Sequence, residues 1–219
     1  MVIWDWEFAI KVLPDLFKAM RVTVAATFAG FGLALVIGLI LALGRRASFK
    51  PLSLLSRGII EFIRSTPLLI QLFFIFYALP LATGISLSAF QAGALGLGLH
   101  YGTYLSEVYR AGIDAIPRGQ WEAATALNFS RLHTWTRIIL PQAIPPIIPV
   151  MGNYLIAMFK ETPLLSTITV VEMLQTAKII GSEWYRYLEP FTIVGALFLL
   201  LSYPASVLVR RLELRLNQR

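Results

Sequence analysis

Long apolar runs alternate with short charged segments along the whole chain. Residues 22–43 are 22 consecutive positions without a charge, which make ~33 Å of helix at ~1.5 Å per residue and cross a ~30 Å hydrocarbon core. Four more apolar runs follow at residues 66–82, 87–105, 138–158 and 191–209. The pattern predicts an all-α membrane protein with five transmembrane helices.

Polar residues, glycines and prolines modify three of these runs. We expect the polar turn at residues 61–64 to extend the second helix upstream. In the third run, Gly98 and Gly102 have the GxxxG spacing of close helix packing, and His100 is expected to be a hydrogen-bonded interior histidine. The fourth run holds four prolines, each of which removes a backbone donor, so we expect a broken helix in the protein interior; they are Pro141, Pro145, Pro146 and Pro149.

A shorter apolar segment at residues 163–180 is interrupted by Glu172 and Lys178. It is shorter and more polar than a typical span. We interpret it as a partly inserted or interior helix.

The composition agrees with a membrane protein. Hydrophobic residues make up 57% of the 219 positions and charged residues 14%, with a mean hydropathy of +0.71, whereas soluble domains are usually ~45–50% apolar. The absence of cysteine excludes disulfides, thiolate metal sites and a cysteine nucleophile. The first 20 residues lack a basic segment before an apolar one, so no cleavable signal peptide is expected.

The formal net charge of +7 comes from basic residues between the apolar runs and not from one patch. Nucleic-acid binding is therefore not expected. If the amino terminus is outside, 13 of the 19 basic residues fall on the inner side, where Lys and Arg accumulate. This distribution predicts an outer amino terminus and a cytoplasmic carboxyl terminus.

The longest polar inner segment, residues 107–137, is predicted to form two helices joined by a tight turn. Pro117 suits the first turn of a short helix, Asn128 suits a left-handed residue that ends it, and Ser130 can cap the next helix. The small side chains of Ala123 and Ala124 leave the first helix slim enough for a groove in a partner. The alternative is an amphipathic loop that rests on lipid headgroups.

The same segment resembles the EAA motif of ABC importer permeases, whose pattern is EAA, three residues, Gly, nine residues and I-x-LP. Glu122-Ala123-Ala124, then Asn128, then the Ile-Ile-Leu-Pro of residues 138–141 match its spacing. Asn128 in the glycine position is the one departure. In that family the motif forms a coupling helix that docks on the ATPase, so the resemblance implies an ATPase-coupling segment made of Glu122, Ala123, Ala124, Leu127 and Asn128.

Residues 61–72 and 159–164 look like the polar amino acid branch of these permeases, although Ser65, Glu161 and Pro163 depart from its usual residues. Residues 126–128 and 153–165 are similar to the ectoine/hydroxyectoine uptake permeases within it. The resemblance implies a type I importer transmembrane domain over residues 20–212, with five helices and a cytoplasmic coupling helix. Residues 1–19 would be an outer interfacial segment and residues 213–219 a cytoplasmic tail.

The resemblance also implies the surroundings of the chain. It would be a multi-pass protein of the bacterial inner membrane that needs no cofactor of its own, because ATP and Mg²⁺ bind the ATPase. Its partners would be an ABC ATPase dimer, an extracytoplasmic solute-binding protein and a second permease half, identical or homologous. The cargo would be a small zwitterionic solute, namely a polar amino acid or a compatible solute such as ectoine.

Charged residues at membrane depth are candidates for the substrate pathway. Lys160 and Glu161 follow the proline-rich run and either reach the outer interface or face a central cavity; both readings stay open. With them we place Thr162 and the mid-span Gln71 in the candidate pathway, although Gln71 also suits helix packing. The Glu and Arg residues of two i,i+3 spacings are expected to form ion pairs: Glu61 with Arg64, and Glu107 with Arg110.

A membrane-embedded enzyme and a passive channel are the two alternative functions. A membrane-embedded enzyme would need a catalytic or metal cluster, yet the chain has two histidines, no cysteine and no HExxH motif. No Gly-Lys dipeptide is present, so a Walker A loop is absent and ATP hydrolysis must occur on another chain. A passive channel would move solute without ATP.

Overall fold

The first helix is the longest element of the described residues. The computed structural model describes residues 4–216, and its first helix is α1 (Trp6–Arg45). The Asp5 carboxylate starts α1 by accepting hydrogen bonds from the Glu7 and Phe8 backbone N–H groups, at 3.0 and 3.1 Å. α1 passes residues 19 and 20 without a break, so the described part of the predicted interfacial segment continues into the first span.

α1 packs closely against α5 (Ala89–Asp114) through glycines. A Cβ atom at Gly98 would lie 2.6 Å from Leu33 Cβ, and one at Gly102 would lie 2.9 Å from Ile37 Cγ2. Since real Cβ atoms do not approach that closely, these positions require glycine. The prediction that the GxxxG spacing is a packing surface is confirmed.

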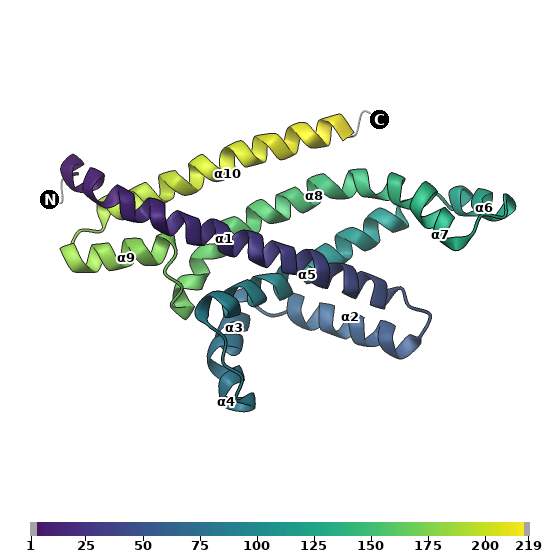
Figure 1. The fold of residues 1–219 in the computed structure, drawn as a ribbon, viewed down its shortest axis with the longest axis horizontal. Coiled ribbons are helices and arrows are strands. Elements are labelled where there is room, and N and C mark those ends of the chain that lie inside the picture. The colour runs from purple at the N-terminus through teal and green to yellow at the C-terminus, as the bar shows by residue number, and fades with distance from the viewer. Residues whose placement is uncertain (1–3, 217–219) are drawn as a thin grey trace.

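The second predicted span is bent into two parts. α2 (Lys50–Arg64) lies beside α1, and the following arm is made of α3 (Leu68–Phe73), a π-helical turn η1 (Phe74–Ala78) and α4 (Leu79–Thr83). The two parts meet at 105°, and the arm projects from the body (Figure 1). The expectation that residues 61–64 extend this span upstream was wrong, because Pro67 disfavours helical geometry at Thr66 and ends α2.

The proline-rich run is a continuous helix. Three elements follow one another without a break: α7 (Arg131–His133), a π-helical turn η2 (Thr134–Ile139) and α8 (Leu140–Glu161). The prediction of a broken helix was wrong. Pro141 follows η2 closely, and π-helical turns and neighbouring helices accommodate prolines within membrane helices. Residues 131–139 form α7 and η2, which agrees with the helix predicted after Ser130 and not with a loop.

The segment after α8 is interior, as expected. Thr162, Leu165, Ser166 and Ile168 are buried within η3 (Thr162–Ile168), a 3₁₀ helix. α9 (Met173–Trp184) follows, and its first turn is capped by the buried Glu172 carboxylate, which accepts from the Leu174 and Gln175 N–H groups at 2.9 and 2.7 Å.

α10 (Leu188–Leu216) completes the bundle. In the described residues, α1, α10 and the stretch 131–168 are long and apolar enough to cross a membrane, and the bent pair of α2 with the arm makes a fourth. α5 has 26 residues, enough for ~39 Å of helix, and corresponds to the third predicted span. α6 (Arg118–Ala126) lies at the end of the molecule opposite to α9 (Figure 1).

Candidate functional site

α6 and the turn after it form the segment in which the sequence predicts ATPase coupling. Asn128 has a φ of 53°, so the predicted left-handed residue is confirmed. The Asn128 N–H donates to the Thr125 carbonyl and the Phe129 N–H donates to the Ala124 carbonyl, both at 3.0 Å. This pair of bonds is a Schellman motif, which satisfies the last carbonyls of α6.

α6 and its turn have one face packed against the chain and one exposed face. Ala124 is 1% exposed and packs within the chain, where Trp121 meets Trp135 of η2 edge to face at 5.2 Å. The other members of the predicted segment are exposed to solvent: Glu122, Ala123, Leu127 and Asn128. The exposed face is therefore open to a partner, whereas Ala124 packs α6 against its own chain.

A second site lies between α3, α5 and the end of α8. The Tyr101 hydroxyl on α5 donates a hydrogen bond of 2.8 Å to Glu161 Oε2. One residue earlier, His100 Nδ1 lies 3.2 Å from Gln71 Oε1. The predicted pathway residues Gln71 and Glu161 therefore contact two adjacent residues of α5. His100 is the hydrogen-bonded interior histidine that was expected.

Thr162 has a different role from these residues. Its side chain is fully buried, and its hydroxyl donates to the Phe159 carbonyl at 2.7 Å. The hydroxyl is thus used at the end of α8.

Lys160 lies at the level of the first apolar run, which is part of α1. A Cβ atom at Gly30 of α1 would lie 3.3 Å from the Met158 sulfur, so the two residues share a depth. Gly30 is about 12 Å from the start of the uncharged run at Val22, and Lys160 is only about 3 Å along α8 from Met158. Lys160 is nevertheless exposed, and no hydrogen bond or ion pair joins it to the described residues.

Three tyrosines surround the Glu161 site, and sequence reasoning missed them. The Tyr104 ring lies 6.3 Å from Tyr101 and 5.7 Å from Tyr154 of α8. Arg64 at the end of α2 lies over the Tyr104 ring at 5.1 Å. Their signal in the sequence is the concentration of tyrosines in two apolar runs, at i,i+3 on α5 and facing it on α8.

Tyr104 and Tyr154 open onto a cavity of about 420 Å³ between α5 and α8, whose lining also includes Arg64 and Glu107. The Glu107 carboxylate and the aromatic faces attract cations, and the Arg64 side chain attracts anions. The region is thus suited to a small molecule that carries both charges.

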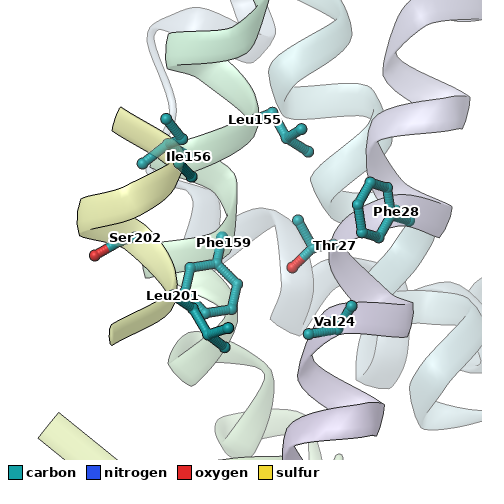
Figure 2. A pocket seen from close by; sticks show the side chains of 9 residues that line it. Val24, Thr27, Phe28, Leu155, Ile156, Phe159, Leu201 and Ser202 are labelled. Carbon is teal, nitrogen blue, oxygen red and sulfur yellow. The ribbon is translucent and has the colours of Figure 1, made fainter. Parts of the chain in front are cut away.

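A second groove, of about 220 Å³, lies on a different face of α8 (Figure 2). Leu155 and Phe159 of α8 enter it beside Val24 and Phe28 of α1. The Thr27 hydroxyl at its edge donates to the Thr23 carbonyl at 2.9 Å. The groove lacks a charged lining residue, so it does not suit a charged solute.

An ion-pair network joins the ends of α1 and α5 just before α6. Glu107 pairs with Arg45 and, at 2.8 Å, with Arg110; Asp114 pairs with Arg46 and, at 3.0 Å, with Arg110. The expected pair of Glu107 with Arg110 is confirmed. The expected pair of Glu61 with Arg64 was wrong, because Arg64 lies over the Tyr104 ring and Glu61 is exposed.

The opposite end of the molecule has a second ionic contact. Arg186, between α9 and α10, bonds Glu189 and lies 3.4 Å from Asp5. The hydrogen bond with Glu189 raises the pKa of Arg186 above its ordinary value. The contact ties the start of α1 to the connection between α9 and α10.

Known proteins share this architecture. The family model described as "Binding-protein-dependent transport system inner membrane component" matches residues 34–218. The chain is 47% identical to the probable amino-acid ABC transporter permease protein y4tG of Sinorhizobium fredii, over 98% of this chain and 93% of that protein. It is 37% identical to the probable amino-acid permease protein YxeN of Bacillus subtilis, over 93% and 92% of the two chains.

A solved structure agrees with the sequence relatives. A chain in the crystal structure of an amino acid ABC transporter with histidines matches with a TM-score of 0.91 and 35% identity, over 98% of this chain and 100% of that one. The relatives are named as permeases and not as enzymes. The chain belongs to the family of binding-protein-dependent transport system inner membrane components, the membrane-spanning permeases of ABC importers.

Proposed function

We propose that this permease moves a small zwitterionic solute, a polar amino acid or a compatible solute such as ectoine, between α5 and α8. The observation that carries the proposal is the pair of adjacent opposite charges at membrane depth, Lys160 and Glu161, of which Glu161 bonds Tyr101 next to Tyr104 of the cavity lining. A zwitterion that leaves water loses hydration at both charged ends. One cation and one anion in the pathway offset part of that loss. The names of the relatives favour amino acids over ectoine.

The exposure of Lys160 supports a second permease half. A lysine that faces lipid at this depth costs at least ~2.5–3.5 kcal/mol, and this chain supplies no partner for it within the described residues. A water-filled cavity closed by a second, identical or homologous permease half would remove that cost. Gln71 and the Tyr101–Glu161 pair then lie on the wall of the same central pathway.

ATP binding and hydrolysis take place on a separate ATPase dimer, and we propose that Glu122, Ala123, Leu127 and Asn128 contact it. Their position on the exposed face of α6 and its turn supports this contact. An extracytoplasmic solute-binding protein would deliver the solute to the opposite end. The amino terminus lies outside and the carboxyl terminus in the cytoplasm, in agreement with the distribution of Lys and Arg.

Uptake into proteoliposomes tests the proposal. The permease is reconstituted with its ATPase and solute-binding protein, and ATP-dependent uptake is measured for neutral, cationic and anionic amino acids and for ectoine. Lys160→Met and Glu161→Gln should each lower uptake of the transported zwitterion more than tenfold, while basal ATP hydrolysis persists. A tenfold loss corresponds to about 1.4 kcal/mol of interaction free energy with the solute. Lys18→Met, which removes an exposed lysine of α1, is the matched control.

The other outcomes identify the alternatives. Uptake without ATP would indicate a passive channel, and chemical conversion of the solute would indicate an enzyme. Normal uptake by both Lys160→Met and Glu161→Gln would remove these residues from the pathway.

A further inference from the structure

The side-chain amide of Gln71 has a defined orientation. Its Nε2 lies 2.8 Å from the Ile63 carbonyl, 3.0 Å from the Thr66 carbonyl and 2.9 Å from Thr66 Oγ1. These carbonyls lie at the break between α2 and α3, where the Ile63 carbonyl also accepts from the Thr66 N–H at 3.3 Å. A flipped amide would place its oxygen against two carbonyl oxygens, so the hydrogen-bond network assigns the nitrogen to this side.

The orientation of Gln71 fixes the protonation of His100. Gln71 Oε1, which can only accept, lies 3.2 Å from His100 Nδ1, so Nδ1 must carry a proton. In a neutral imidazole the other nitrogen, Nε2, is then an acceptor with a free lone pair. Within the described residues no hydrogen bond to His100 Nε2 is present.

The surroundings of His100 place this acceptor beside the pathway. The half-buried imidazole lies against the rings of Tyr101 and Tyr104, with ring centres 5.6 and 5.2 Å apart. Tyr101 bonds Glu161, and Tyr104 lines the cavity. His100 is thus next to the group proposed to attract the positive end of the solute.

We infer that Gln71 is a positioning residue that holds His100 in the Nδ1–H form, and that His100 Nε2 accepts a hydrogen bond from an N–H group of the solute. The solute class is thereby narrowed to zwitterions with an N–H donor at the cationic end, such as primary ammonium compounds, over fully methylated ammonium compounds. The inference rests on the proposed transport of a zwitterion and adds a specificity-determining residue to it.

Two substitutions at His100 separate a solute contact from a structural role. In His100→Asn the amide nitrogen replaces Nδ1 and can still donate to Gln71, but the Nε2 acceptor is lost. In His100→Gln the longer side chain places an amide oxygen near the Nε2 position and loses the contact with Gln71. We expect the KM for solute uptake to rise roughly tenfold or more in His100→Asn and less in His100→Gln. The other histidine, His133 at the end of α7, provides the control, His133→Gln.

The protonation is measured directly by ¹⁵N NMR. The permease is labelled with ¹⁵N-histidine and assembled with unlabelled partners at pH ~8, where an ordinary imidazole is neutral. Because the chain has two histidines, the His133→Gln spectrum identifies the His100 signals. We expect a protonated Nδ1 and an unprotonated Nε2 that shifts when the transported amino acid is added, and Gln71→Leu should allow both tautomers.

Each contrary result has its own meaning. A protonated Nε2 in the wild-type spectrum, a KM higher in His100→Gln than in His100→Asn, or wild-type KM values in both variants would overturn the inference. If the wild-type complex takes up none of the solutes, the proposed function fails, and the spectrum still decides the protonation of His100.

Discussion

Tyr101 on α5 and Glu161 at the end of α8 are joined by a hydrogen bond of 2.8 Å, although 60 residues separate them in the sequence. α5 leads into α6 and α8 follows it, so this bond connects the two helices that flank the coupling segment. A solute that competes for Glu161 would change the contact between these helices. The geometry thus offers a direct route from the pathway to the ATPase side.

Removal of the Tyr101 hydroxyl tests this connection. Tyr101→Phe keeps the ring and removes one hydrogen bond to a charged group, worth roughly 1.5–3 kcal/mol. We expect solute-stimulated ATP hydrolysis to fall about tenfold, and the double variant with Glu161→Gln to fall no further than Glu161→Gln alone. Tyr77→Phe, whose exposed hydroxyl bonds the Thr167 carbonyl at 3.2 Å, should stay close to wild type. Additive losses in the double variant would contradict a shared role.

The exposed face of α6 should be essential for coupling. Ala123→Arg adds a long charged side chain on this face, and a mismatched interface costs several kcal/mol. ATP-dependent uptake should be lost while the permease still inserts and remains folded. Ser48→Arg adds the same charge to the exposed inner turn between α1 and α2 and should transport normally. Ala124→Arg is a poor test, because Ala124 is buried within its own chain. Normal uptake by Ala123→Arg would place the ATPase contact elsewhere.

The inner ion-pair network should stabilise the fold. Glu107→Gln weakens contacts with two arginines in a partly buried site, and we expect a loss of about 1–3 kcal/mol in the free energy of unfolding. Thermal unfolding of the detergent-solubilised protein measures it. The matched control is Asp15→Asn, which breaks the exposed pair with Lys18 at 3.1 Å and should change stability by less than about 0.5 kcal/mol. Equal melting temperatures for the two variants would argue against a stabilising network.

The orientation in the membrane follows from cysteine labelling, which the natural absence of cysteine makes clean. Ser48 and Ser86 are both exposed and lie in turns at opposite ends of the bent second span. Ser48→Cys should react with an impermeant thiol reagent only from the cytoplasmic side. Ser86→Cys should react only from outside. The reverse pattern would invert the proposed topology.

The sequence by itself determined the membrane class, most of the helices and the coupling turn. These features depend on local properties: the length of an apolar run, the left-handed geometry that Asn128 tolerates, and the small residues at Gly98 and Gly102. Each can be recognised because it depends on neighbouring residues or on a short spacing. The ion pair of Glu107 with Arg110 was predictable for the same reason.

Only the tertiary structure decided the bend at Pro67, the continuity of α8 and the side chains that surround Glu161. A proline shows where a helix lacks a donor, but its surroundings determine whether the helix bends or continues. At the bend before Pro67, the Gln71 side chain bonds the Ile63 carbonyl, whereas before Pro141 the π-helical turn η2 lets the helix continue. The meeting of Gln71 with His100, and of Tyr101 with Glu161, depends on how α3, α5 and α8 pack. Such contacts join residues far apart in the sequence, and no local pattern encodes them.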